Sequence, residues 1–391
     1  MTNAFRNRDH ALLFTMSLML WSLDPDGQNV TFADTRNDSV GKALYNSLFK
    51  DYDVHGSLRG PYRCCTSNIY KTKDSKYYHI HGSLNPDKVL DMLKLPRSPS
   101  TEDSFEHVLP LFIDKVVRYD SAELDQLSNR DFKQAGTICY SKEEYAQTEQ
   151  GKANAHVGLW ETVRTNEHQP PCWWSSSGDP SSKMRPTDPS RPLAGIKVLD
   201  ATRIIAAPVV SRGLAELGAS VLRITSASVP DATLYHPELN WGKWNASLDF
   251  KDPEDQQKMK ELILECDIFI SSYRPGALAK WGFDADQVLE MCKERDKGIV
   301  VVRLNSYGWH GPLKDRSGWQ QISDAVWIIS CLAFSPFSSF RPSFFSELMC
   351  ISICLTFLLS TVGSPSNLVV PWAMMNLSPP SFPILTSGNY H

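Results

Sequence analysis

The chain has 391 residues, a formal net charge of −4, and 42% hydrophobic residues. This length is typical of two or three domains, and the composition is that of a soluble protein able to bury a sizeable core. No basic excess is available to neutralise phosphates, which argues against nucleic-acid binding.

The apolar run near the N-terminus and the cysteines indicate the cellular compartment of the protein. Residues 11–20 are apolar and follow Arg6 and Arg8, but no small-x-small cleavage site comes after them, which favours a buried helix over a signal peptide. The nine cysteines include the adjacent pair Cys64 and Cys65 and form no C-x-x-C. This usage predicts reduced thiols in a cytoplasmic protein.

Composition divides the chain into four parts. Residues 1–166 have a mixed α/β pattern, and residues 167–192 are a linker rich in Pro and Ser. Residues 193–325 carry the clearest periodic pattern, while residues 326–391 form an apolar tail of different composition.

Within the first part, two local patterns stand out. Ser141 and Glu144 have the spacing of a capping box at a helix start. His79 and His81 lie two residues apart on a predicted strand and therefore share one face. No third ligand follows them at a suitable spacing, so no metal site is predicted.

In the third part, strands alternate with helices. Apolar runs predict strands at 196–199, 220–225, 267–270 and 299–302. Helices are predicted at 208–217, 253–266 and 284–295. This βαβ spacing predicts a Rossmann-like α/β fold, a doubly wound parallel sheet with helices on both faces.

Sheets of this kind bind ligands beyond the carboxyl ends of their strands. The first predicted strand continues into the turn at 200–208, which lacks the glycines of G-x-G-x-x-G and of a P-loop. The sequence therefore excludes those two nucleotide fingerprints. A strand-to-helix turn can still receive a phosphate at the helix N-terminus.

Five sequence blocks follow in order, at 191–203, 217–221, 240–249, 273–277 and 307–312. In this order they resemble the opening strand, the second strand, the N-x-x-K block, the N-F-R-P-G block and the Y-G-x-x-G-P turn of the family III CoA-transferases, the CaiB/BaiF family. The first part resembles the first half of a two-half branch of that family more loosely, through residues 61–62, 70–74 and 79–86.

The resemblance implies an acyl-CoA:carboxylate CoA-transferase. In that reaction an Asp carboxylate attacks the thioester and forms a mixed anhydride, which CoA thiolate and the acceptor acid then resolve. It implies acyl-CoA and a carboxylic acid as partners, no permanently bound cofactor, no metal, and a homodimer in the full-length form. No nucleic-acid or membrane partner is expected, and a racemase or dehydratase acting on acyl-CoA is an alternative.

Six residues fall on CoA-binding positions of the family: Arg203, Ile204, Ile205, Lys243, Tyr273 and Lys280. Residues 203–205 match the loop that covers the CoA nucleotide. Lys243 and Lys280 match positions suited to phosphates, and Tyr273 matches an aromatic that can lie against adenine. The alternatives are solvated surface lysines and a tyrosine that packs within its loop. Ser226 stands where the family often has a basic residue, so that contact is not assigned.

The catalytic position departs from the family pattern. The family has G-F-D-x-x-x-Q-A after the turn, whereas residues 318–325 place Gln320 where the Asp stands. A neutral amide cannot form the anhydride, so no catalytic residue is assigned. Asp324, one helical turn further on, is an alternative carboxylate. We expect a CoA-transferase by descent that is inactive in this form, or a CoA-binding partner of an intact paralogue.

The tail at 326–391 resembles no part of the family. Its apolar run at 348–362 is shorter than the roughly 20 residues that span a bilayer. We expect a disordered or poorly packed tail, derived from a retained intron or a shifted frame, with the natural transcript splicing near codon 326 into a longer chain. A membrane anchor is the alternative.

Overall fold

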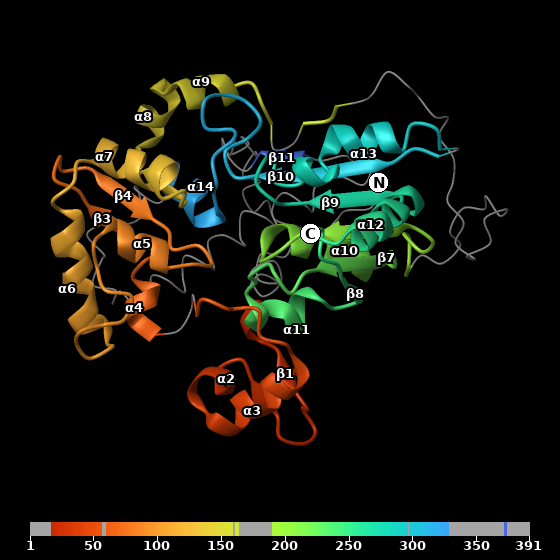
Figure 1. The fold of residues 1–391 in the computed structure, drawn as a ribbon, viewed down its shortest axis with the longest axis horizontal. Coiled ribbons are helices and arrows are strands. Elements are labelled where there is room, and N and C mark those ends of the chain that lie inside the picture. The colour runs from red at the N-terminus through yellow and green to blue at the C-terminus, as the bar shows by residue number, and fades with distance from the viewer. Residues whose placement is uncertain are drawn as a thin grey trace, which may run out of the picture.

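The computed structural model describes residues 17–56, 60–158, 161–163, 190–295, 297–327 and 371–373. Of residues 36, 37, 320, 324, 327 and 371–373 it describes only the backbone. The described residues form a small N-terminal lobe, a lobe around an antiparallel sheet and a lobe around a parallel sheet (Figure 1). The predicted linker lies almost wholly outside these residues.

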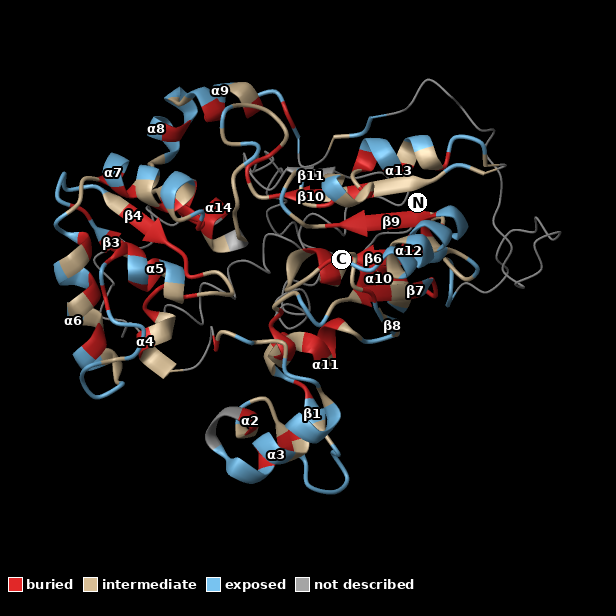
Figure 2. Cartoon of the chain, viewed as in Figure 1, coloured by how far each residue is buried: buried red, intermediate tan, exposed pale blue. Residues whose placement is uncertain are grey.

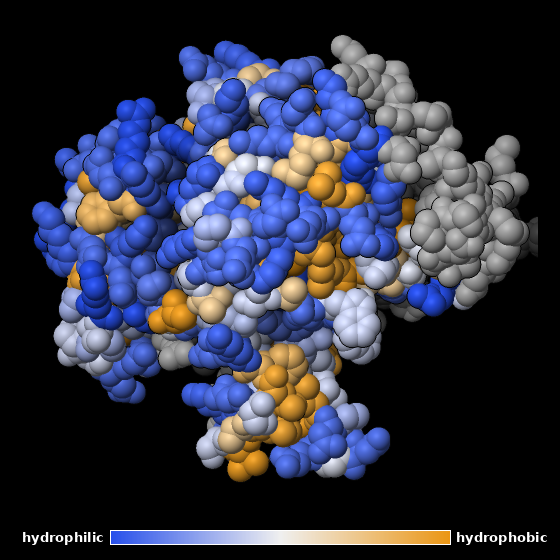
Figure 3. All heavy atoms as spheres, turned by 45° about the vertical axis from the view of Figure 1, so that its right-hand side comes forward, coloured by the Kyte–Doolittle hydropathy of each residue, from blue (hydrophilic) through white to orange (hydrophobic). Residues whose placement is uncertain are grey.

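The N-terminal lobe packs against the parallel-sheet lobe. Leu18 is buried against Leu239, and Tyr45 Oη donates a hydrogen bond of 2.6 Å to the carbonyl of Thr233. Apolar side chains also remain on its surface, among them Val40 and Leu48 (Figure 3). Its elements are η1 (Ser17–Met19), β1 (Ser22–Leu23), β2 (Val30–Thr31), α2 (Asp34–Asn37) and α3 (Ser39–Leu48). Because it contacts η3 (Thr233–Tyr235) and α11 (His236–Leu239), this lobe is distinct from the lobe formed by residues 60–158. The sequence did not predict this division.

The antiparallel lobe is built on the sheet β3-β4-β5, with β3 (Asn68–Lys71), β4 (Tyr77–Ile80) and β5 (Gly136–Ile138). Tyr78, Leu90 and Phe112 lie in its core and are fully buried. The surrounding helices are α4 (Gly60–Cys64), α5 (Asp87–Met92), α6 (Phe105–Val116), α7 (Ser121–Gln126), η2 (Leu127–Asp131), α8 (Lys142–Gln147) and α9 (Glu149–Asn154). The predicted capping box of Ser141 and Glu144 is confirmed at the start of α8.

The parallel sheet confirms the predicted fold class. Its strands β6 (Lys197–Ala201), β7 (Ser220–Thr225), β8 (Lys243–Ser247), β9 (Ile268–Ser271) and β10 (Val300–Asn305) take the order β10-β9-β6-β7-β8. The short strand β11 (Pro371–Ala373) pairs in parallel with β10. The sequence did not predict β8, because this edge strand is largely exposed and carries no apolar run. Of the predicted tail at 326–391, the structure describes only residues 326–327 and 371–373, so the apolar run at 348–362 lies outside the described residues.

Helices cover both faces of this sheet. Successive strand residues point to opposite faces, so Val198 and Leu199 belong to two different cores. Helix α10 (Ala206–Glu216) packs on the Val198 face, and α12 (Pro253–Glu265) and α13 (Ala285–Met291) pack on the Leu199 face. The central strands are accordingly buried along most of their length (Figure 2).

Helix α14 (Gln320–Trp327) leaves the parallel sheet and packs on the antiparallel lobe. Ile322 and Val326 are fully buried against Tyr145, and the backbone N–H of Tyr140 donates to the carbonyl of Val326. The start of α14 therefore lies where the two lobes meet. None of the helices in the described part of the chain is long and apolar enough to cross a membrane.

Candidate functional site

A cleft of about 670 Å³ separates the parallel sheet from the antiparallel lobe. One wall consists of the loops that follow β6, β7, β8, β9 and β10. The other includes His81 and Ser83 together with residues 316–319. The cleft thus opens at the carboxyl ends of the strands, where the order of a doubly wound sheet reverses between β6 and β9.

The turn between β6 and α10 forms the centre of the sheet wall. Arg203, Ile204 and Ile205, three of the residues predicted to bind CoA, all line the cleft. Ile204 has a φ of 71°, which is strained for a β-branched residue. No side chain caps the helix at Ile205, so the positive end of α10 is available to an anion at this wall.

Two further side chains, Tyr273 and Lys280, complete the sheet wall near this turn. Tyr273 and Lys280 line the cleft, as does Arg203. The Arg203 guanidinium lies 5.4 Å from the centre of the Tyr273 ring and donates a hydrogen bond of 2.8 Å to the carbonyl of Pro230. Burial raises the pKa of Tyr273, so its hydroxyl stays neutral. Lys280 Nζ lies 4.8 Å from the Trp281 ring centre. The structure therefore brings two cations and one aromatic ring to a single wall.

For Lys243 the structure differs from the predicted phosphate contact, because its side chain does not reach the cleft. It is fully buried, and its Nζ donates to Asp200 Oδ2 at 3.0 Å, Ser211 Oγ at 2.8 Å and the carbonyl of Pro208 at 2.8 Å. Burial lowers the pKa of Lys243, and the charge of Asp200 opposes that effect. With all three donor directions used inside the protein, this ammonium group does not face a phosphate.

The Lys243 ion pair nevertheless supports the site from behind. Asp200 is the penultimate residue of β6, and its carboxylate also accepts hydrogen bonds of 2.5 Å from Thr202 Oγ1 and from Ser211 Oγ on α10. The carboxylate thereby joins both ends of the turn that carries Ile204. Lys243 acts through Asp200 as a positioning residue.

The opposite wall contains the segment that precedes α14. Gly318 and Trp319 line the cleft, and α14 begins at the next residue, Gln320. The side chains of Gln320 and Asp324 lie outside the described part of the structure. Their backbone positions are four residues apart in the same helix.

His81 lies in this wall, and the sequence did not identify it as a cleft residue. Its ring stacks on Trp319 with centroids 5.5 Å apart and an interplanar angle of 9°, and its Nδ1 accepts a hydrogen bond from the backbone N–H of Ser83. Burial lowers the pKa of His81 to about 4, although a hydrogen bond with Gln321 raises it, so the ring is neutral at pH 7. The spacing of His79 and His81 was the signal in the sequence, but it could not show that the His81 ring lies against Trp319.

This chain is similar to proteins that are named as CoA-transferases. The model of CoA-transferase family III matches residues 193–329. The acetyl-coenzyme A transferase nodX of Hypoxylon pulicicidum is 42% identical over 357 residues, which cover 90% of this chain and 58% of that protein. An acyl-CoA transferase of Gibberella moniliformis is 36% identical over 66% of this chain and 44% of its own length. The human succinyl-CoA:glutarate CoA-transferase is 30% identical over 38% of this chain and 35% of its own. The chain thus spans about half the length, or less, of these relatives.

Proposed function

We propose that the chain binds an acyl-CoA thioester in its cleft, because residues 193–329 match the model of CoA-transferase family III. The observation that carries the proposal is the sheet wall, where Arg203, Lys280 and the uncapped start of α10 border one cavity. Two of the relatives are named for acetyl or acyl transfer, which supports an acyl-CoA as the ligand.

The phosphates of CoA match the charges of the sheet wall. A helix N-terminus and cationic side chains are the groups that proteins use to hold phosphates. Tyr273 offers a ring face beside them, suited to a purine. We place the nucleotide part of CoA against the turn at 203–205, with its pantetheine arm directed across the cleft towards the start of α14.

The acyl end of the ligand would then reach Gln320. In the family's reaction a carboxylate at this point attacks the thioester carbonyl, which releases CoA thiolate and forms a mixed anhydride. The thiolate then displaces the donor acid and leaves CoA bound to that carboxylate as a thioester. The acceptor acid attacks this thioester, and the released CoA thiolate attacks the acceptor's acyl carbon, which gives the new acyl-CoA and frees the carboxylate. The Gln320 amide cannot form that anhydride. The chain is therefore a CoA-transferase by descent whose present activity is thioester binding without transfer.

Calorimetric titration with CoA tests the binding site. Arg203→Ala and Lys280→Ala should each weaken binding by roughly tenfold, the value of one charge-assisted contact of about 1.4 kcal/mol. Lys260→Ala, an exposed lysine of α12 outside the cleft, is the matched control and should leave the affinity unchanged. Equal affinity in all four proteins would exclude this placement of the phosphates.

Restoring the carboxylate tests the catalytic part. Wild type should give no thioester exchange between acyl-CoA and labelled CoA, and no hydroxylamine-sensitive adduct. Gln320→Asp should form that adduct, whereas Gln320→Asn, which has the same shape without the charge, should not. Turnover by wild type, or a labelled Asp324 in its mass spectrum, would contradict the proposal.

A further inference from the structure

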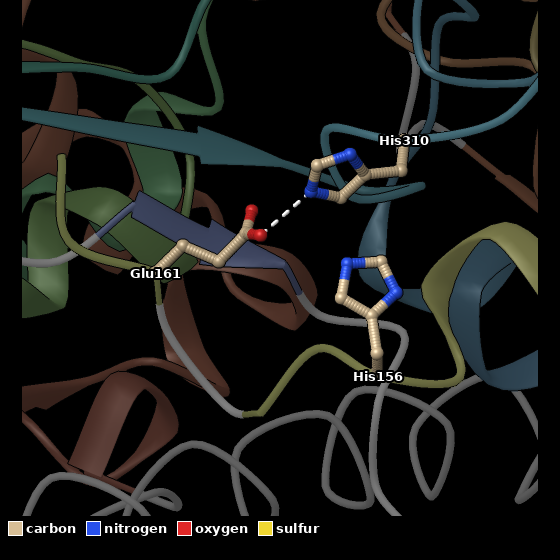
Figure 4. A group of neighbouring side chains, drawn as sticks. All are labelled: His156, Glu161 and His310. Carbon is tan, nitrogen blue, oxygen red and sulfur yellow. Dashed lines mark hydrogen bonds and ion pairs between the residues drawn. The ribbon is translucent and has the colours of Figure 1, made fainter.

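Outside the cleft, two histidines and a glutamate converge from separate segments of the chain. His156 and Glu161 follow α9, and His310 lies in the turn that follows β10 (Figure 4). One potential ligand atom from each lies within 4.8 Å of the other two. We propose that these three residues bind a divalent transition metal ion, with Zn²⁺ the ion that fits them best.

The donor set matches that of zinc. Zinc takes imidazole nitrogen and carboxylate oxygen at about 2.0–2.2 Å, and sites with three protein ligands keep a fourth position for water. Tetrahedral bonds of that length separate ligand atoms by roughly 3.3 Å. The pair His310 Nε2 and Glu161 Oε1 already lies at 2.6 Å, so the metal site forms by modest side-chain rotation. His156 is exposed and His310 is 40% exposed, which leaves both rings room to turn.

The backbone around the cluster is held in place by buried amide side chains of α9. Gln150 Nε2 donates to the carbonyls of Tyr307 and His310 at 2.6 and 2.8 Å, and Asn154 Nδ2 donates to the same His310 carbonyl at 3.0 Å. His156 follows Asn154 by two residues. The backbone of His310 is therefore fixed before any ion arrives, which lowers the entropic cost of binding.

An ordinary ion pair between His310 and Glu161 is the competing explanation. That explanation gives no role to His156, whose ring centroid lies 5.3 Å from that of His310. A metal site requires His156 as a ligand, so this exposed residue separates the two explanations.

A bound ion would connect the segment after α9 to the connection between β10 and α14. That connection continues into residues 316–319 of the cleft wall. Metal binding would therefore stabilise the contact between the antiparallel lobe and the parallel-sheet lobe, and should raise the melting temperature of the whole chain.

Calorimetric titration of the full chain with Zn²⁺, after dialysis against a chelator, is the test. One equivalent should bind with micromolar or tighter affinity and raise the melting temperature. His156→Ala and His310→Ala should each weaken that binding by at least about tenfold. The matched control is His107→Ala, because His107 lies 3.7 Å from Glu102 in an exposed pair outside the cluster, and it should bind zinc as wild type does.

Circular dichroism establishes that each variant folds, and His156→Ala is the variant least able to disturb folding because this side chain is exposed. No saturable zinc binding by wild type would overturn the proposal. So would unchanged affinity in His156→Ala, which would leave an ion pair at His310 or assign the bound zinc to cysteine thiols.

Discussion

A single buried ion pair holds the ligand-facing turn in shape. Lys243 and Asp200 both have fully buried side chains, and the Asp200 carboxylate receives hydrogen bonds from Thr202 and Ser211 as well. A buried charge that loses its partner cannot recover the solvation it gave up on folding. The pair therefore matters more for the conformation of the turn than any single surface charge at the cleft.

We predict that Lys243→Met lowers the free energy of unfolding by about 3–5 kcal/mol, because it leaves Asp200 charged and unpaired. Asp200→Asn in the same chain should recover part of that loss, since it removes the uncompensated charge. Urea unfolding of the two single variants and the double variant measures the coupling. Lys260→Met, an exposed control, should stay within about 0.5 kcal/mol of wild type. Strictly additive losses would show that the two groups do not interact.

His81 makes the stability of the chain depend on pH. Its ordinary pKa of 6.5 falls to about 4 in the folded protein because of burial. Between these values the unfolded chain binds a proton that the folded chain does not. The contribution of the neutral His81 ring to the free energy of unfolding is therefore complete above pH 6.5 and declines as the pH falls towards 4. His79, which is fully buried, contributes in the same direction because burial also lowers its pKa.

From pH 7 to pH 5, wild type should lose about 2 kcal/mol more unfolding free energy than His81→Gln, which has no proton to gain. Urea denaturation at the two pH values measures this difference. His107→Gln, the exposed control, should show the pH response of wild type. A His81→Gln response as steep as that of wild type would mean that His81 titrates in the folded state.

Helix α8 begins with the capping box that the sequence predicted. Ser141 Oγ accepts from the backbone N–H of Glu144 at 3.1 Å, and Glu144 Oε2 accepts from the backbone N–H of Ser141 at 2.8 Å. The helix then places Tyr145 in the core that it shares with Ile322 and Val326 of α14. Capping α8 therefore helps to orient the surface on which α14 packs.

Ser141→Ala should lower the free energy of unfolding by about 1 kcal/mol, because the N–H of Glu144 loses its acceptor. Thermal unfolding followed by circular dichroism gives the value. Ser141→Asp keeps an acceptor at the cap and should retain most of the stability. Equal losses in both variants would show that the cap contributes nothing here.

Polar contacts join the two large lobes alongside the apolar packing of α14. The Arg316 guanidinium binds both carboxylate oxygens of Asp125, at 2.9 and 2.8 Å, across 191 residues of sequence. Gln150 accepts from the N–H of Leu313 and donates to the carbonyls of Tyr307 and His310. These contacts fix the cleft wall that leads to α14.

Gln150→Leu should lower the free energy of unfolding by at least about 2 kcal/mol, since it removes the partners of the Tyr307 carbonyl and the Leu313 N–H, at about 1–3 kcal/mol each. Denaturant unfolding tests this, with the exposed Gln147→Leu of α8 as the matched control. The Gln150 variant should also bind CoA more weakly, because the walls of the cleft lose their alignment. A variant as stable as the control would indicate that water replaces the amide.

Local pattern and motif were sufficient to determine the α/β class, the parallel sheet and the cap at Ser141, because they depend on periodicity, propensity and short-range spacing. The family resemblance assigned Arg203, Ile204, Ile205, Tyr273 and Lys280 to one CoA site. All five line the cleft, since the turns after parallel strands meet at one edge of the sheet. Only the tertiary structure decided that Lys243 points inward, because a lysine looks alike in sequence whether its partner is a phosphate or a buried carboxylate. It also decided that His81 meets Trp319, and that His156 approaches His310, which 154 positions separate in the numbering. Such contacts depend on how lobes pack, and packing is a property of the folded surface that no local segment encodes.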